Sequence, residues 1–111
     1  MSDVTSIDDG TATEWLSPRD ITLAVVMFWA TFSDPCRPYA VVFKGVAAGN
    51  ADVRLRFASV DVDAALNTVR EQDIRQVPTT HFFRNGQLID RAVGYLSTEA
   101  LKAKIEALLN A

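Results

Sequence analysis

The chain has 111 residues and a mass of 12.2 kDa, so residues 1–111 are predicted to form one domain, because a second would have too little core to fold. A hydrophobic content of 49% with 23% charged residues is ordinary for globular proteins and excludes a disordered chain. The net charge of -3 and the pI of about 5.0 lack the basic surplus of a nucleic-acid-binding protein.

The longest apolar run, residues 23–30, is too short to span a bilayer, and no membrane association is expected. Residues 1–6 lack the basic start and apolar stretch of a secretory signal, so the expected location is the cytoplasm. Cys36 is the only cysteine and His81 the only histidine. They can form neither an internal disulfide nor a structural zinc site, and no metal or cofactor is predicted.

The first half of the chain predicts helix, strand and helix. Asp8, Asp9 and Thr11 are typical of a helix start, and Trp15-Leu16 would be the buried end of that helix, closed by Ser17-Pro18. Residues 21–30 are β-branched and aromatic without polar alternation, which indicates a central strand buried on both faces.

Two prolines, Pro35 and Pro38, exclude a continuing strand but are compatible with the first turn of a helix. Residues 39–48 are predicted to be that helix, ended by Gly49-Asn50. Its predicted inward face holds Val42, Phe43 and Val46.

The second half predicts a strand over residues 55–62 and a helix over 63–71, with Ala65, Leu66 and Val69 facing inward. Strands over 79–83 and 88–95 flank Arg84-Asn85-Gly86-Gln87, and Asn-Gly favours the positive φ angles of a type I′ hairpin turn. Ser97 is expected to cap a last helix. The apolar stripe of that helix is Leu101, Ile105 and Leu108.

Strand–helix–strand alternation followed by a hairpin predicts an α/β fold, with a central mixed β-sheet and helices on both faces. Residues 28–37, Phe-Trp-Ala-Thr-Phe-Ser-Asp-Pro-Cys-Arg, resemble the active-site segment of thioredoxins, in which Cys-x-Pro-Cys begins a helix; the first cysteine is here Ser33. Three further segments resemble the cis-proline segment, the Phe-x-Asn-Gly hairpin and the groove glycine of the same family. They are Val77-Pro78-Thr79, Phe83-Arg84-Asn85-Gly86 and Val93-Gly94.

The resemblance extends over residues 21–109, in order and with the expected spacing, and implies a single thioredoxin-like domain with the thioredoxin fold. It implies that Ser33 and Cys36 occupy the catalytic positions. It also implies a substrate groove, with protein thiols or disulfides as substrates and a thioredoxin reductase as a candidate partner. The residues assigned to the groove segments are Trp29, Phe32, Asp34, Pro35, Val77, Pro78, Val93, Gly94 and Tyr95.

The chemistry of the motif depends on the missing cysteine. A thiol at the start of a helix is favoured as thiolate by unpaired amides and the helix dipole, and a second thiol three residues on resolves the mixed disulfide. A serine hydroxyl does not exchange with disulfides, so Ser33 should abolish dithiol turnover. Either evolutionary loss or an introduced Cys→Ser substitution accounts for Ser33.

Other departures from the thioredoxin pattern also weaken redox function. Met27 stands where the family has a buried aspartate, and Ser59 where it has the paired lysine. Losing both avoids a lone buried charge but removes a proton relay. The helix proline of the family corresponds to Val41, while Pro38 lies earlier, and Asp34 is expected to raise the pKa of a nearby thiol.

Two functions remain in competition. The first is a thiol–disulfide oxidoreductase of cell redox homeostasis with an impaired site, in which Cys36 forms mixed disulfides only. The alternative is a redox-inactive binding or chaperone-type module that holds extended peptide beside Pro78, as in chaperedoxins that also carry Ser-x-x-Cys. Glutaredoxin-like chemistry is disfavoured, because one-cysteine glutaredoxins keep the first cysteine rather than the second. Whether the chain is an enzyme therefore stays open, and His81 is expected only to pack within its strand.

Overall fold

The computed structural model describes residues 3–15 and 23–111, and elements alternate along these segments. In chain order they are β1 (Val4–Ile7), α1 (Asp9–Trp15), β2 (Leu23–Trp29), α2 (Cys36–Ala48), β3 (Leu55–Asp61), α3 (Leu66–Glu71), β4 (Thr79–Arg84), β5 (Gln87–Val93) and α4 (Thr98–Leu109). None of the helices in these segments is long and apolar enough to cross a membrane.

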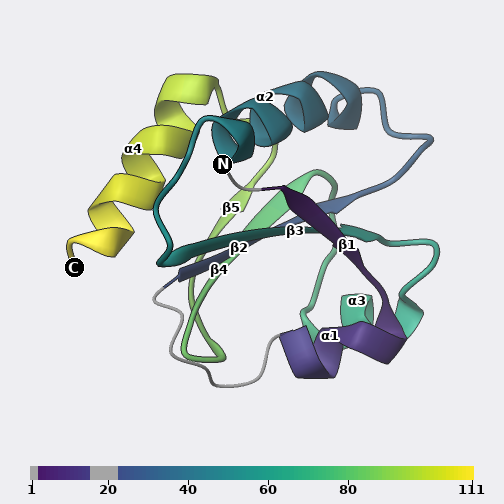
Figure 1. Cartoon of the computed structure of the whole chain (residues 1–111). Helices are drawn as coiled ribbons and strands as arrows, with labels where there is room; N and C mark the ends of the chain where they lie inside the picture. The colour runs from purple at the N-terminus through teal and green to yellow at the C-terminus, as the bar shows by residue number, and fades with distance from the viewer. Residues whose placement is uncertain (1–2, 16–22) are drawn as a thin grey trace.

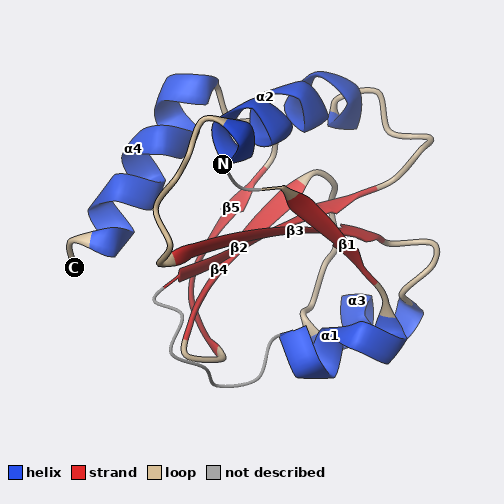
Figure 2. Cartoon of the chain, viewed as in Figure 1, coloured by secondary structure: helices blue, strands red, loops and turns tan. Residues whose placement is uncertain are grey.

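The strands form a five-stranded sheet in the order β1-β3-β2-β4-β5. The strands β1, β3 and β2 are parallel, whereas β4 is antiparallel to both β2 and β5, so the predicted mixed sheet is confirmed. Helices α2 and α4 cover one face and α1 and α3 the other, as Figures 1 and 2 show. The predicted α/β fold with helices on both faces is confirmed.

Each face of the sheet has its own apolar core. The α2/α4 side contains Tyr39, Phe43, Phe57, Phe82 and Leu101, all fully or almost fully buried. The α1/α3 side is built around Phe28, Val26 and Val60. Because β2 contributes to both cores, it is the central strand that the unbroken apolar run predicts.

The hairpin and the last helix follow the predicted turn and cap chemistry. Asn85 and Gly86 have φ angles of 53° and 81°, as a type I′ turn between β4 and β5 requires. The Ala100 amide donates a 3.1 Å hydrogen bond to Ser97 Oγ at the start of α4. Leu101 and Ile105 are buried on the predicted stripe.

Several predicted boundaries are wrong. The strand β1 was not predicted, because four residues paired on one side only carry too little apolar pattern. Helix α2 begins at Cys36 rather than at residue 39, and α3 begins at Leu66 rather than at residue 63. Residues 16–22, which include Leu16 of the predicted helix end, the predicted Ser17-Pro18 stop and Ile21, lie outside the described residues.

The prediction that Leu66 faces inward is wrong, since this residue is 64% exposed. The buried residue of α3 is Thr68, which donates from its amide and its hydroxyl to the Asp9 carboxylate at 2.8 and 2.7 Å. These bonds tie α1 to α3 and lower the pKa of Asp9. Of the residues predicted to face inward, Ala65 is buried, while Thr68 takes the buried position in the helix expected for Leu66.

Candidate functional site

The segment between β2 and α2 forms two consecutive turns. The Ser33 amide donates to the Ala30 carbonyl at 3.2 Å, and the Cys36 amide donates to the Ser33 carbonyl at 3.1 Å. Pro35, with φ of -65°, precedes the helix in a conformation that already suits it. The turns therefore place Cys36 at the first residue of α2, with Ser33 three residues before it.

Cys36 is buried, with 3% of its surface exposed, whereas Ser33 is half-buried and Asp34 and Pro35 are exposed. Cys36 lines a shallow hollow of about 340 Å³ at the end of β2. The other residues that line it are Trp29, Ala30, Thr31, Arg37 and Ala40. The structure thus brings two of the predicted site residues, Trp29 and Cys36, to one hollow.

A second group of predicted residues gathers where β4 begins and β5 ends. The Val77–Pro78 peptide bond is cis, and the Gly94 amide donates to the Pro78 carbonyl at 2.8 Å. Gly94 has φ of +95°, a conformation that side-chain-bearing residues rarely adopt. Among the described residues, neither backbone group of Val77 has a backbone hydrogen-bond partner.

Large apolar side chains near these segments are open to solvent. Phe32 is 74% exposed, Val93 55% and Tyr95 50%. Phe32, which the sequence assigns to the groove, therefore lies on the surface rather than in the core. Six of the residues predicted for the substrate groove, Phe32, Val77, Pro78, Val93, Gly94 and Tyr95, are together called the apolar groove segment; Pro78 among them is buried and Val77 is partly buried.

Tyr39 connects α2 to this segment, a link that the sequence patterns did not reveal. Its ring is fully buried and contacts the Tyr95 ring edge-on, with 6.0 Å between ring centroids. Its hydroxyl lies 2.5 Å from Thr80 Oγ1, two residues after Pro78. Burial raises the pKa of Tyr39 to about 12, so the phenol stays neutral at physiological pH.

The residues that the strand register brings together around Met27 are uncharged. The strand register sets Met27 opposite Ser59 on one side and opposite Thr80 on the other. The two positions at which thioredoxins carry an aspartate and a lysine are therefore neighbours, as their joint loss suggests. In this chain the buried polar contact at this level of the sheet is the neutral pair Tyr39–Thr80.

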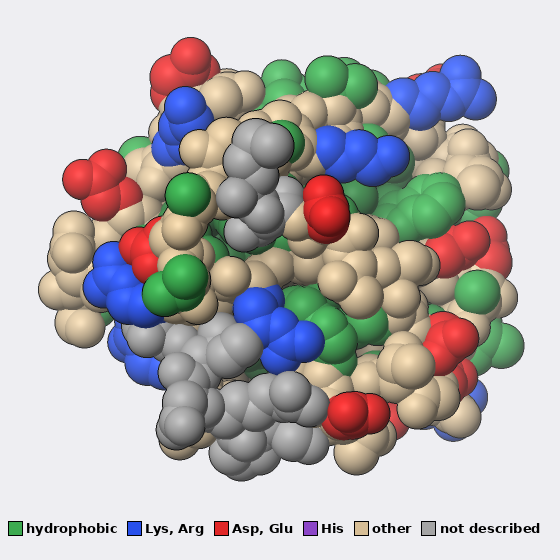
Figure 3. All heavy atoms as spheres, viewed as in Figure 1, with side chains coloured by type: hydrophobic (Ala, Val, Ile, Leu, Met, Phe, Trp, Pro, Cys, Tyr) green, Lys and Arg blue, Asp and Glu red, His purple; other side chains and the backbone are tan. Residues whose placement is uncertain are grey.

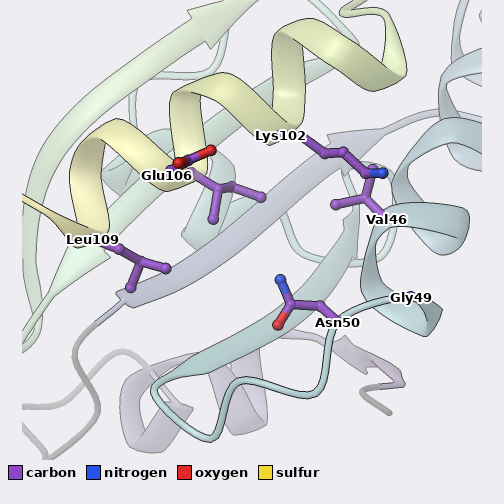
Figure 4. Close-up of a pocket in the computed structure, with 7 residues that line it drawn as sticks. Val46, Gly49, Asn50, Lys102, Glu106 and Leu109 are labelled. Carbon is purple, nitrogen blue, oxygen red and sulfur yellow. The ribbon is translucent and has the colours of Figure 1, made fainter.

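A further hollow, of about 270 Å³, lies between the C-terminal end of α2 and α4. Figure 4 shows Val46 and Asn50 on one side of it and Lys102 and Leu109 on the other. It contains none of the predicted site residues and lies at the opposite end of α2 from Cys36. On the face drawn in Figure 3, described acidic and basic side chains are interspersed rather than gathered by sign.

A mixed sheet of this order, a cis-proline opening the strand next to the central one, and a cysteine on the first turn of the helix that follows the central strand together define the thioredoxin-fold class of proteins. The model of the thioredoxin family matches residues 13–107. The chain belongs to the thioredoxin family.

Named relatives agree with this assignment. Thioredoxin of the yeast Malassezia sympodialis is 40% identical over 72 residues, which cover 65% of this chain and 69% of that protein. Thioredoxin of the fish Ictalurus punctatus is 37% identical over 83 residues, 75% of this chain and 77% of that protein. The crystal structure of the Malassezia thioredoxin superposes with a TM-score of 0.86 at 32% identity, covering 98% of this chain and 93% of that one.

Proposed function

We propose that the chain is a thioredoxin-family protein that engages thiols and disulfides of other proteins, and that Ser33 limits it to a single covalent step. Family membership supports a redox role of this class, with protein thiols as substrates and a thioredoxin reductase as a candidate electron donor. The observation that carries the limitation is the position of the only cysteine, buried at the first residue of α2, with a serine three residues before it.

The covalent step balances with one thiol. The Cys36 thiolate attacks one sulfur of a partner disulfide, a mixed disulfide forms, and the other partner sulfur leaves as thiolate. Release of a reduced partner needs a second thiol to attack that mixed disulfide. Since the chain has no second cysteine, turnover stops unless an external thiol resolves the adduct.

The alternative function is a non-catalytic binding module for extended peptide, and a specific observation favours it. The apolar groove segment has three large side chains that are half or more exposed, beside a residue, Val77, with no backbone partner in the described part of the chain. An extended peptide could add backbone hydrogen bonds there, as in strand addition. The neutral interior around Met27 fits both functions, because neither requires a proton relay.

Reduction of insulin with dithiothreitol as electron source tests the proposal. Four forms are compared: the chain as it stands, Ser33→Cys, Cys36→Ala and Ser33→Cys/Cys36→Ala. We expect Ser33→Cys to reduce insulin well above background and the other three forms to stay far below it. Dithiothreitol is itself an external thiol and can slowly resolve a Cys36 adduct, so the limitation to one covalent step would be refuted by activity of the unchanged chain equal to that of Ser33→Cys.

Inactivity of Ser33→Cys would instead show that the changes around Met27 and Ser59 have removed the redox chemistry. The binding module would then be favoured. The binding module is tested by the affinity for an unfolded client peptide, measured with the unchanged chain and with Cys36→Ala. Equal affinities would support it, because binding in the groove should not depend on the thiol. A Val93→Asp variant tests the groove segment itself, since it places a charge there at a position that is already 55% exposed. We expect this variant to bind the peptide more weakly than the unchanged chain does.

A further inference from the structure

The first turn of α2, which carries Cys36, has weak backbone support. The Tyr39 amide closes this turn by donating to the Pro35 carbonyl, and the two atoms are 3.4 Å apart, beyond the usual range of about 2.7–3.2 Å. Pro38, the residue before Tyr39, has no N–H and donates no bond at all. The backbone alone therefore holds the turn around Cys36 less firmly than it holds the middle of a regular helix.

The side chain of Tyr39 attaches this turn to the sheet. Tyr39 lies three residues after Cys36, which places the two side chains on the same face of α2, and both residues are buried. The Tyr39 hydroxyl lies 2.5 Å from Thr80 Oγ1. Thr80 is fully buried in β4, and the strand register sets it beside Met27 of the central strand. One hydrogen bond thus connects the start of α2 to the middle of the sheet.

The surroundings of this hydrogen bond make it costly to break. Two rings pack on the Tyr39 ring, Phe43 and Tyr95, each with 6.0 Å between ring centroids. In the part of the chain that the structure describes, neither the Tyr39 nor the Thr80 hydroxyl has another hydrogen-bond partner. A buried hydroxyl that loses its partner destabilises a protein by more than an ordinary hydrogen bond contributes. Tyr39 is therefore held in place by both its ring and its hydroxyl.

We propose that Tyr39 is a positioning residue for Cys36: its hydrogen bond to Thr80 keeps the first turn of α2 closed, and the thiol becomes reactive when this bond is released. The inference rests on the proposed function in taking Cys36 as the group that attacks a disulfide, and it adds the step that precedes the attack. Tyr95, which contacts the same ring, belongs to the apolar groove segment. The Tyr39 side chain thus lies between the groove segment and the turn that carries the thiol.

Two rates report on the proposed opening. The first is the reaction of Cys36 with dithiodipyridine, a small neutral disulfide. The thiolate attacks one reagent sulfur, a mixed disulfide forms, and the other sulfur leaves as an absorbing thiolate. The second rate is the hydrogen exchange of the amide of residue 39, followed by NMR, because this amide closes the turn. If one opening limits both processes, a substitution changes both rates by the same factor.

Three variants test the role of the hydroxyl. Tyr39→Phe keeps the ring, and we expect both rates to rise by about 5- to 30-fold at pH 7, because the Thr80 hydroxyl is left buried without a partner. Adding Thr80→Val removes that hydroxyl too, so the double variant should react and exchange more slowly than Tyr39→Phe. Thr68→Val is the matched control. It removes a buried hydroxyl that donates to Asp9 at 2.7 Å on the other face of the sheet (Figure 1), and it should leave both rates unchanged.

The proposal is overturned if Tyr39→Phe reacts and exchanges like the unchanged chain, or if only one of the two rates rises. It is also overturned if Thr68→Val raises both rates as much as Tyr39→Phe does, or if the double variant is the fastest. Failure of the proposed function is a separate result, because insulin reduction requires engagement of a protein partner and the reaction with a small reagent does not. If Ser33→Cys fails with insulin while the rates follow the expected pattern, the role of Tyr39 stands and only the redox assignment is lost.

Discussion

Lowering the pH from 7 to 5 should destabilise the folded chain through one side chain. Burial, aided by the nearby positive charge of Arg91, lowers the pKa of His81 to about 4 from its ordinary value of 6.5. The unfolded chain therefore binds a proton at a higher pH than the folded chain does, so stability is fully present above pH 6.5 and falls as the pH drops toward 4. The other charged groups near the ring are Arg75 and Asp73, which neutralise each other.

A pKa difference of this size corresponds to a loss of about 2 kcal/mol between pH 7 and pH 5, and about 3 kcal/mol once the pH is below 4. Because His81 is the only histidine, no other imidazole contributes in this window. Carboxylates with lowered pKa values, such as Asp52 at about 2, lose their contribution at lower pH.

Urea unfolding, followed by tryptophan fluorescence in phosphate-free buffers at pH 7, 6 and 5, measures this loss. The matched variant is His81→Leu, which keeps a buried side chain of similar size and removes the titrating group. We expect the unfolding free energy of His81→Leu to change by less than about 0.5 kcal/mol between pH 7 and pH 5, because the variant lacks the side chain that takes up a proton on unfolding. Equal pH dependence in the two proteins would refute the assignment of the acid sensitivity to His81.

Three further predictions concern stability. Tyr39→Phe keeps the ring contacts but leaves the Thr80 hydroxyl without its partner, and should lower the free energy of unfolding in urea by about 1–2 kcal/mol. The double variant with Thr80→Val should lose less stability than the two single variants combined. Strictly additive losses would argue against the hydrogen bond. Ser97→Ala should lower stability by about 1 kcal/mol through loss of the α4 cap, and Ser97→Asp, which retains a capping oxygen, should show little change in melting temperature. Gly94→Ala forces a side chain onto a φ of +95° and should cost about 1–3 kcal/mol; since a Cβ there meets no atom within 4 Å, an unchanged melting temperature would contradict the backbone explanation.

The elements that could be predicted from sequence are those with strong local signals. The apolar run of β2 predicts a strand buried on both faces, Asn85-Gly86 predicts the hairpin, and Ser97 predicts the last helix. Each of these elements is determined by a few adjacent residues and does not depend on contacts with distant ones. The family motifs follow the same rule, since each is a short segment whose order and spacing suffice.

The features that could not be predicted depend on contacts between distant residues. Nothing near β1 in sequence indicates that it pairs with β3, and nothing near Leu66 indicates that Asp9 binds the start of α3 and turns Thr68 inward. Tyr39 and Thr80 are 41 residues apart, and their hydrogen bond follows from the packing of α2 on β4. His81 is similar, because its partner Gln72 and its neighbour Arg91 come from elements that only the fold brings together.

The burial of Cys36 makes the thiol a kinetic probe of its own helix. With 3% of the residue exposed, an alkylating reagent should reach the sulfur mainly when the first turn of α2 opens, and attack of Cys36 on a partner disulfide would need the same opening. Where reclosing is faster than alkylation, the labelling rate is the intrinsic thiol rate multiplied by the equilibrium constant for opening. A time course with the unchanged chain thus reports the free energy of local opening at the start of α2. Urea unfolding measures only the global value, and the difference between the two tells how firmly the β2–α2 junction is held.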